Sequence, residues 1–100
     1  MIAVKKPLFE LGQLVSTPGA LEALQKSDQT PWEFLTCHIS GDWGVVSKND
    51  KQANDDSLLD GSRLLSAYRL KTGQKIWILT EAVGDDGKRT STCLMLPDEY

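Results

Sequence analysis

The chain has 100 residues, of which 40% are hydrophobic and 25% charged, and its formal charge is −3. This composition is typical of an ordinary globular protein and excludes a disordered or collagen-like chain, so we expect a single domain over residues 1–100. The negative charge gives no electrostatic reason to approach DNA, RNA or an anionic membrane, because phosphate binding needs a basic surface.

Neither export nor membrane insertion is expected. No apolar run approaches the roughly 18 residues of a bilayer span. The first residues, MIAVKKPLFELG, lack the apolar stretch and cleavage site of a secretory signal, and residues 1–7 are expected to form a flexible arm. Cys37 and Cys93 each lie in an apolar pattern, which favours structural thiols in a reducing compartment over a disulfide. We therefore expect a cytoplasmic protein.

Two helices are predicted in the first half of the chain. Thr17 followed by proline favours a helix over residues 18–26, because threonine can cap a helix and proline fits its first position. A second Thr-Pro pair begins another helix at Thr30, and Glu33 three positions later predicts a capping box. Gly41 is expected to end this helix in a left-handed conformation.

A third helix is predicted over residues 47–60. Ser47 would cap its start and Gly61 would end it. Its apolar content is low and its carboxylates are numerous. We therefore expect this helix to cover an edge of the sheet rather than to contribute to the core.

Strands are predicted from Arg63 onward, because the apolar period changes there from about 3.6 to about 2. Residues 63–70, 75–82 and 89–96 form three strands, and residues 11–16 are a candidate fourth edge strand. The fold class expected is α+β: an antiparallel meander of three to four strands with two to three N-terminal helices packed on one face. Trp77, in the middle strand, is expected to be buried.

The first candidate site surrounds the chain's one histidine. His38 and Asp42 are four positions apart near a helix end, so a carboxylate could orient the imidazole as an acid–base pair, and Arg63 and Glu81 would complete a polar cluster if their strands end nearby. The structural alternative is favoured. It places His38 at the negative end of the helix dipole and lets Asp42 bond the amides of its own turn.

A second candidate site is a surface for a protein partner. Trp43 lies between Asp42 and a glycine, with a further glycine just before, and such a loop can project a large ring into solvent. We therefore predict that Trp43 is partly exposed and contacts a partner. Asp42, Asn54 and Asp55 complete the expected binding surface.

Metal and cofactor sites are not expected. The neighbouring residues Cys37 and His38 point to different sides of a helix, and Cys93 is far away in the sequence, so no set of zinc ligands is complete. No nucleotide-binding or methyl-donor motif is present. Ser66 lies in a predicted strand without the strained turn of a hydrolase nucleophile.

Five stretches of the chain together resemble a family of small bacterial proteins from plasmids and other mobile elements, described as plasmid-related proteins or as type I restriction subunits. The stretches cover nearly the whole sequence and read VSTPGALEAL, HISGDWG, GSRLLSAY, KIWILTEA and LPDEY. The family pattern carries over to His38, Gly41, Asp42, Trp43, Gly44, Asn54, Gly61, Arg63, Ser66, Tyr68, Trp77, Thr80 and Glu81. The chain departs from the family after Glu81, where the turn over residues 83–89 is longer.

The resemblance implies an accessory protein of a mobile element. Because no nucleotide or methyl-donor motif is present, the chain cannot itself be a methyltransferase or nuclease subunit. We expect a small protein that acts through protein contacts, and the alternative is a small enzyme that uses His38 and Asp42. An enzyme requires His38 to be accessible beside a pocket, whereas a binding protein does not.

Overall fold

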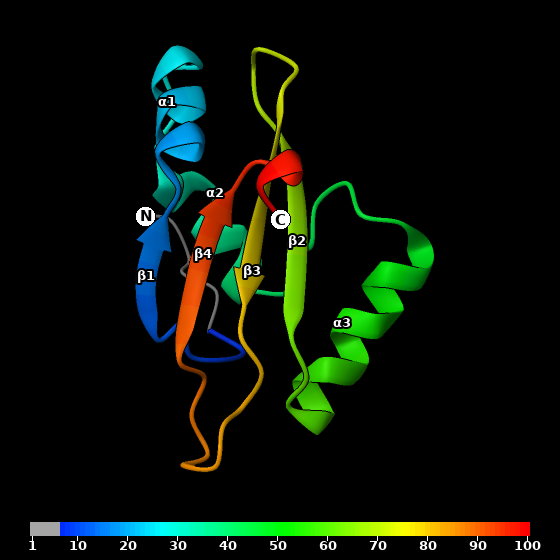
Figure 1. Ribbon diagram of the computed structural model, residues 1–100. Helices are drawn as coiled ribbons and strands as arrows, with labels where there is room; N and C mark the ends of the chain where they lie inside the picture. The colour runs from blue at the N-terminus through cyan, green and yellow to red at the C-terminus, as the bar shows by residue number, and fades with distance from the viewer. Residues whose placement is uncertain (1–6) are drawn as a thin grey trace, which may run out of the picture.

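The fold is α+β, as expected, and a computed structural model describes residues 7–100 (Figure 1). The arm predicted over residues 1–7 lies outside the described residues apart from Pro7, which is exposed. In chain order the elements are β1 (Gln13–Ser16), α1 (Pro18–Lys26), α2 (Pro31–Ile39), α3 (Lys48–Asp60), β2 (Leu64–Arg69), β3 (Lys75–Thr80), β4 (Ser91–Met95) and the 3-10 turn η1 (Pro97–Glu99).

The four strands form one mixed sheet in the order β1-β4-β3-β2. Strands β2, β3 and β4 are the predicted antiparallel meander, but β1 pairs with β4 in parallel, so the expectation of a purely antiparallel sheet is wrong. The parallel direction follows from the path of the chain. The amide of Thr17 still donates to the carbonyl of Leu94, and α1 then begins at Pro18 and packs against β4.

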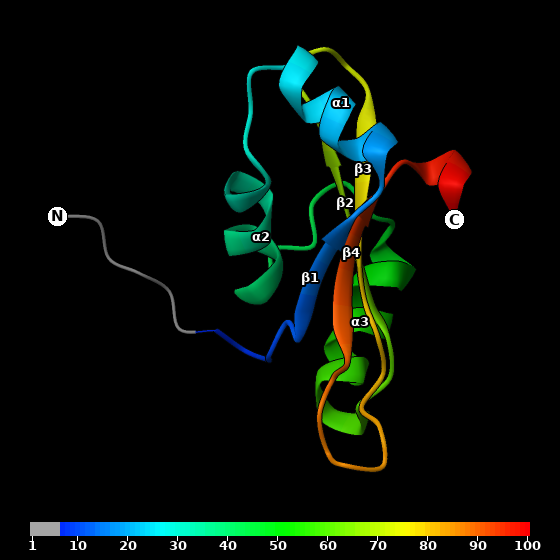
Figure 2. The ribbon, with the colours of Figure 1, turned by 60° about the vertical axis from the view of Figure 1, so that its left-hand side comes forward.

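The two faces of the sheet have different neighbours. Helices α1 and α2 both lie on one side, which we call the inner face (Figure 2). Residues Ile76, Ile78 and Leu94 point to this inner face and are at most 3% exposed. The strand positions between them point to the opposite side, which we call the outer face. The predicted packing of helices on one face is therefore confirmed for α1 and α2.

Helix α3 lies beside β2 at the edge of the sheet, as its low apolar content predicts (Figure 1). Its start and end also agree with the sequence: the hydroxyl of Ser47 accepts a hydrogen bond from the amide of Asp50, and Gly61 adopts a φ of 82°. Only Asn54 and Ser57 of this helix are buried. Among the helices of residues 7–100, none is long and apolar enough to cross a membrane.

The two threonines that precede helices behave differently. The hydroxyl of Thr17 accepts a hydrogen bond from the amide of Ala20 at 3.1 Å, as predicted. Thr30 makes no side-chain capping bond, and the carboxylate of Glu33 instead accepts a bond of 2.6 Å from the side chain of Gln29. The capping box predicted for α2 is therefore wrong, because a neighbouring amide occupies the glutamate.

Trp77 lies on the outer face and is only half-buried, so the expectation that it is buried is also wrong. Strand β3 alternates, with Ile76 and Ile78 on the inner face and Trp77 between them on the other side. Its ring is half-buried and meets the ring of Tyr100 edge-on, with centroids 5.7 Å apart. A central strand buries both of its faces only when both faces are covered.

Candidate functional site

The turn over residues 41–44 packs inward. Trp43 is only 4% exposed, and its ring lies between those of Phe9 and His38, with centroid distances of 6.2 and 5.7 Å. Its indole nitrogen donates a hydrogen bond of 3.1 Å to the carboxylate of Asp55 on α3. The prediction that Trp43 is partly exposed is therefore wrong, because residues distant in sequence fold over the turn from both sides.

The backbone of the same turn pairs with β2 along the strand edge that faces away from β3. The amide of Val45 donates to the carbonyl of Ala67 at 2.7 Å, and the amide of Ala67 donates to the carbonyl of Trp43 at 3.1 Å. The hydroxyl of Tyr68 donates to the carbonyl of Asp42 at 2.6 Å. Burial raises the pKa of Tyr68, so this phenol keeps the proton that it donates.

The four residues predicted to bind a partner are mostly occupied within the protein. Asn54 is 4% exposed and forms two hydrogen bonds with the backbone of Leu65, at 2.8 and 3.0 Å. Asp55 holds the indole of Trp43, and the carboxylate of the exposed Asp42 accepts a bond from the amide of Gly44. These contacts fasten the turn and α3 to the sheet. They leave no exposed aromatic residue at this place.

His38 is completely buried in a chain of hydroxyl groups that crosses the inner face. Its Nδ1 lies 2.5 Å from the hydroxyl of Ser66 on β2, and its Nε2 lies 2.8 Å from that of Thr80 on β3. The hydroxyl of Thr80 is 2.7 Å from that of Thr92 on β4, which donates to the carbonyl of Leu11.

The carbonyl of Leu11, at the end of this chain of hydroxyls, determines which group donates in each hydrogen bond. Because Thr92 donates to the carbonyl of Leu11, it accepts from Thr80, and Thr80 in turn accepts from His38. The imidazole therefore carries its proton on Nε2, and Nδ1 accepts from the hydroxyl of Ser66. Both nitrogens are satisfied in the neutral form, and this form joins α2 to three strands of the sheet.

The acid–base pair of His38 and Asp42, the alternative to a structural role, is not assembled. Burial, together with the nearby charge of Arg89, lowers the pKa of His38 to about 3, and its partners are hydroxyls rather than the carboxylate of Asp42. Arg63 donates instead to the hydroxyl of Tyr100, and Glu81 is exposed. The enzyme alternative required an accessible imidazole, and this imidazole is not accessible.

The buried neutral imidazole predicts an acid-sensitive fold. In the unfolded chain His38 binds a proton below about pH 6.5, whereas in the folded protein it does so only near pH 3, so stability falls as the pH falls through this window. Between pH 7 and pH 5 the loss attributable to His38 is about 2 kcal/mol.

This prediction is tested with urea unfolding curves at pH 7 and pH 5 for the wild type and for His38→Gln, which cannot titrate in this range. The carboxylates are common to both proteins, so their contribution cancels. The wild type is expected to lose about 2 kcal/mol more than the variant between the two pH values. Equal losses would show that the imidazole is reached by protons in the folded state.

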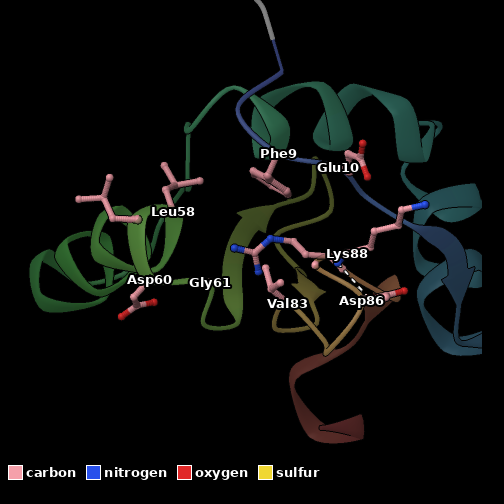
Figure 3. A pocket seen from close by; sticks show the side chains of 11 residues that line it. Phe9, Glu10, Leu58, Asp60, Gly61, Val83, Asp86 and Lys88 are labelled. Atoms are coloured by element: carbon pink, nitrogen blue, oxygen red, sulfur yellow. Dashed lines mark hydrogen bonds between the residues drawn. The ribbon is translucent and has the colours of Figure 1, made fainter.

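A hollow with a volume of about 620 Å³ opens between Phe9 and Glu10, the end of α3 and the turn before β4 (Figure 3). Phe9 and Val83 face it from opposite sides, and charged side chains surround it. The charged residues that line it are Glu10, Asp60, Asp86, Lys88 and Arg89.

Arg89 is the buried charge of this hollow, and three of its N–H donors bond backbone carbonyls. Its guanidinium donates to the carbonyls of Ser62, Glu81 and Ser57, at 2.7, 3.0 and 3.2 Å, and lies 5.7 Å from the ring centroid of Phe9. It therefore holds the end of α3 against the sheet rather than offering a site for an anion. Nothing in the sequence indicates this role, since Arg89 follows a lysine and a glycine-rich turn.

No reactive set of side chains converges in any of these places. Among residues 7–100 no group of three or more histidine, cysteine, aspartate or glutamate side chains could hold a metal ion. Comparisons with protein-family models, with curated proteins and with solved structures found no significant match. The function must therefore be argued from the surfaces of this chain itself.

Proposed function

We propose that this protein is a small accessory protein of a bacterial plasmid or other mobile element, and that it acts in the cytoplasm by binding another protein through the outer face of its sheet. The link to mobile elements and to the cytoplasm rests on the family resemblance and on the two thiols. The binding surface rests on the composition of the outer face, which is the observation that carries the proposal.

The outer face is apolar, although α1 and α2 lie on the other side of the sheet and the short helix η1 lies over only part of it (Figure 2). A sheet with one solvated face usually alternates apolar and polar side chains, with the polar ones outward. Here the outward positions at the centre of all four strands are apolar. They are Val15, Leu65, Ala67, Trp77, Leu79, Cys93 and Met95. Several of these are half-buried, and Val15 is 42% exposed.

A hollow of about 290 Å³ lies on the outer face between β2, β3 and α3. Leu65 and Leu79 line it from the sheet, and Tyr100, which is 58% exposed, lines it from the end of the chain. A hollow of this kind can receive one apolar anchor residue of a partner. Such anchors supply most of the binding energy at protein interfaces.

The charges around the outer face indicate the chemistry of the partner. Arg63, Arg69 and Lys75 occupy outward positions at or beside the ends of β2 and β3, and Glu81 is the one acidic residue on the same side of these two strands. Acidic residues border the same face, because Asp50 lines the hollow beside Arg63, and Asp98 and Glu99 belong to η1. We therefore expect a partner segment with an apolar anchor flanked by side chains of both charges.

The proposal is tested by affinity purification from the native bacterial host with the wild type and three variants. Leu79→Glu places a charge at the centre of the outer face, and Tyr100→Ser removes one wall of the hollow. The matched control is Leu21→Glu, because Leu21 is 45% exposed on α1, away from the outer face.

A partner captured by the wild type and by Leu21→Glu should be lost with both outer-face variants, while all variants keep nearly the wild-type melting temperature. Truncation of an interface anchor residue typically costs about 2 kcal/mol of binding free energy, which corresponds to roughly thirtyfold weaker binding. A partner that remains bound to Leu79→Glu would rule out the outer face as the binding surface.

A further inference from the structure

The two edges of the sheet differ in whether their outward backbone groups are hydrogen-bonded. At the β2 edge, the backbone groups that point away from the sheet belong to Leu65, Ala67 and Arg69, and those of Leu65 and Ala67 at its centre are paired. Asn54 bonds both the amide and the carbonyl of Leu65. The turn pairs with both groups of Ala67, through Val45 and Trp43. The centre of this edge is therefore closed to a further strand.

The β1 edge is open. The amides of Gln13 and Thr17 donate to the carbonyls of Thr90, just before β4, and of Leu94 in β4, at 3.0 Å each. The residues between them that point away from β4 are therefore Leu14 and Ser16. Their outward amides and carbonyls have no hydrogen-bond partner among residues 7–100. In Figure 1, β1 forms one side of the sheet and no element lies beyond it.

The side chains at this edge offer no protection against pairing. Natural edge strands usually carry charges, prolines or bulges that prevent association. The four residues of β1 are Gln13, Leu14, Val15 and Ser16, and none is charged. Leu14 and Val15 are 38% and 42% exposed, and Trp32 on α2 is 59% exposed. Together they line a groove of about 200 Å³ beside the strand.

An extended backbone with uncharged side chains is what such an edge accepts, and β1 of a second copy meets both requirements. Two β1 strands that pair antiparallel with Leu14 opposite Ser16 form four hydrogen bonds, because each residue offers one outward amide and one outward carbonyl. Other symmetric registers form fewer bonds. They bring in Gly12, whose φ is 66°, or Pro18, which has no amide hydrogen.

We propose that the protein forms a symmetric dimer through antiparallel pairing of β1 with β1 of a second copy, with the two-fold axis at Val15. The axis is perpendicular to the sheet, so two four-stranded sheets join into one. The inner faces stay on one side, and each Leu14 and Trp32 approaches its symmetry mate across the groove. No like charges meet, because the strand has none.

This pairing also joins the two outer faces into one continuous surface, but it does not depend on what binds there. The dimer is tested by molecular mass and amide exchange of the isolated protein, whereas the partner proposal is tested by affinity purification. Failure of either leaves the other intact.

The first experiment is hydrogen exchange over a dilution series of the wild type. The amides of Leu14 and Ser16 should be protected at high concentration and should lose that protection on dilution, in step with a fall from twice the monomer mass to the monomer mass. The amides of Gln13 and Thr17 are the internal reference, since they are bonded to the carbonyls of Thr90 and Leu94 within the same protomer and should stay protected throughout.

The second experiment places charges at the two-fold axis. Val15 faces its own symmetry mate as a non-hydrogen-bonded pair, where Cα atoms are only about 4.5 Å apart. Val15→Lys and Val15→Glu should therefore each be monomeric, and an equimolar mixture of the two should recover the dimer mass. Leu21→Lys, at a similarly exposed position on α1, should dimerise like the wild type.

Two outcomes would overturn the proposal. A wild type that stays monomeric over the whole dilution series, with Leu14 and Ser16 exchanging freely, would show that the edge does not pair with itself. A Val15→Lys variant that dimerises as strongly as the wild type would show that a dimer exists but that β1 does not form it. Circular dichroism of both charged variants checks that they are folded.

Discussion

Replacing Trp43 with alanine is expected to lower the free energy of unfolding by about 3 to 5 kcal/mol. The ring is 4% exposed and packs between Phe9 and His38, so its removal leaves a cavity at the junction of α2, α3 and the sheet. The bond from its indole nitrogen to Asp55 is lost as well. Urea unfolding followed by circular dichroism measures the change.

Two further variants show whether the loss of stability comes from the packed ring of Trp43 or would follow from replacing any tryptophan. Trp43→Phe keeps most of the ring but removes the donor to Asp55, and it should cost roughly half as much as the alanine variant. Trp32→Ala removes a ring that is 59% exposed, and at dilutions that keep the protein monomeric it should cost less than about 1 kcal/mol. If Trp43→Ala and Trp32→Ala unfold at the same urea concentration, the ring of Trp43 is not packed in solution.

The helix and strand positions could be predicted because their signals are local. Helix α1 covers the predicted residues 18–26, since Thr17 both caps it and precedes its first proline. Helix α3 ends at Gly61 for a similarly local reason, the left-handed conformation that glycine tolerates. The hairpin between β2 and β3 follows from the change of period and a glycine in its turn.

The features that could not be predicted correctly depend on contacts between segments that are distant in the sequence. Trp43 looks like an exposed loop residue because glycines flank it, yet Phe9 and Asp55 reach it from other parts of the chain. The direction of β1 depends on where α1 must begin, which no residue within the strand encodes. Arg89 finds its carbonyl partners on segments that lie up to 32 positions away.

His38 shows why a catalytic pattern in a sequence can mislead. Its spacing from Asp42 is that of neighbours on a helix, but α2 ends at Ile39, and the imidazole turns toward the sheet instead. There the hydroxyls of Ser66 and Thr80 satisfy both nitrogens. Inward-facing polar residues in two predicted strands were the available signal, because a buried hydroxyl needs a partner from another element.

Replacing Gly44 with alanine is expected to cost roughly 3 to 5 kcal/mol, because left-handed strain and a backbone collision add. Gly44 has a φ of 77°, and a Cβ there would lie 1.9 Å from the carbonyl oxygen of Ala67, the group that pairs with the turn. Gly73 provides a matched control. Its φ is 91°, and a Cβ would meet nothing within 4 Å, so Gly73→Ala should show the strain alone, about 1 to 2 kcal/mol. Thermal and urea unfolding of both variants measure the difference. Equal losses would mean that the turn can move away from β2 at little cost, and then the closed edge of the sheet would not depend on this turn.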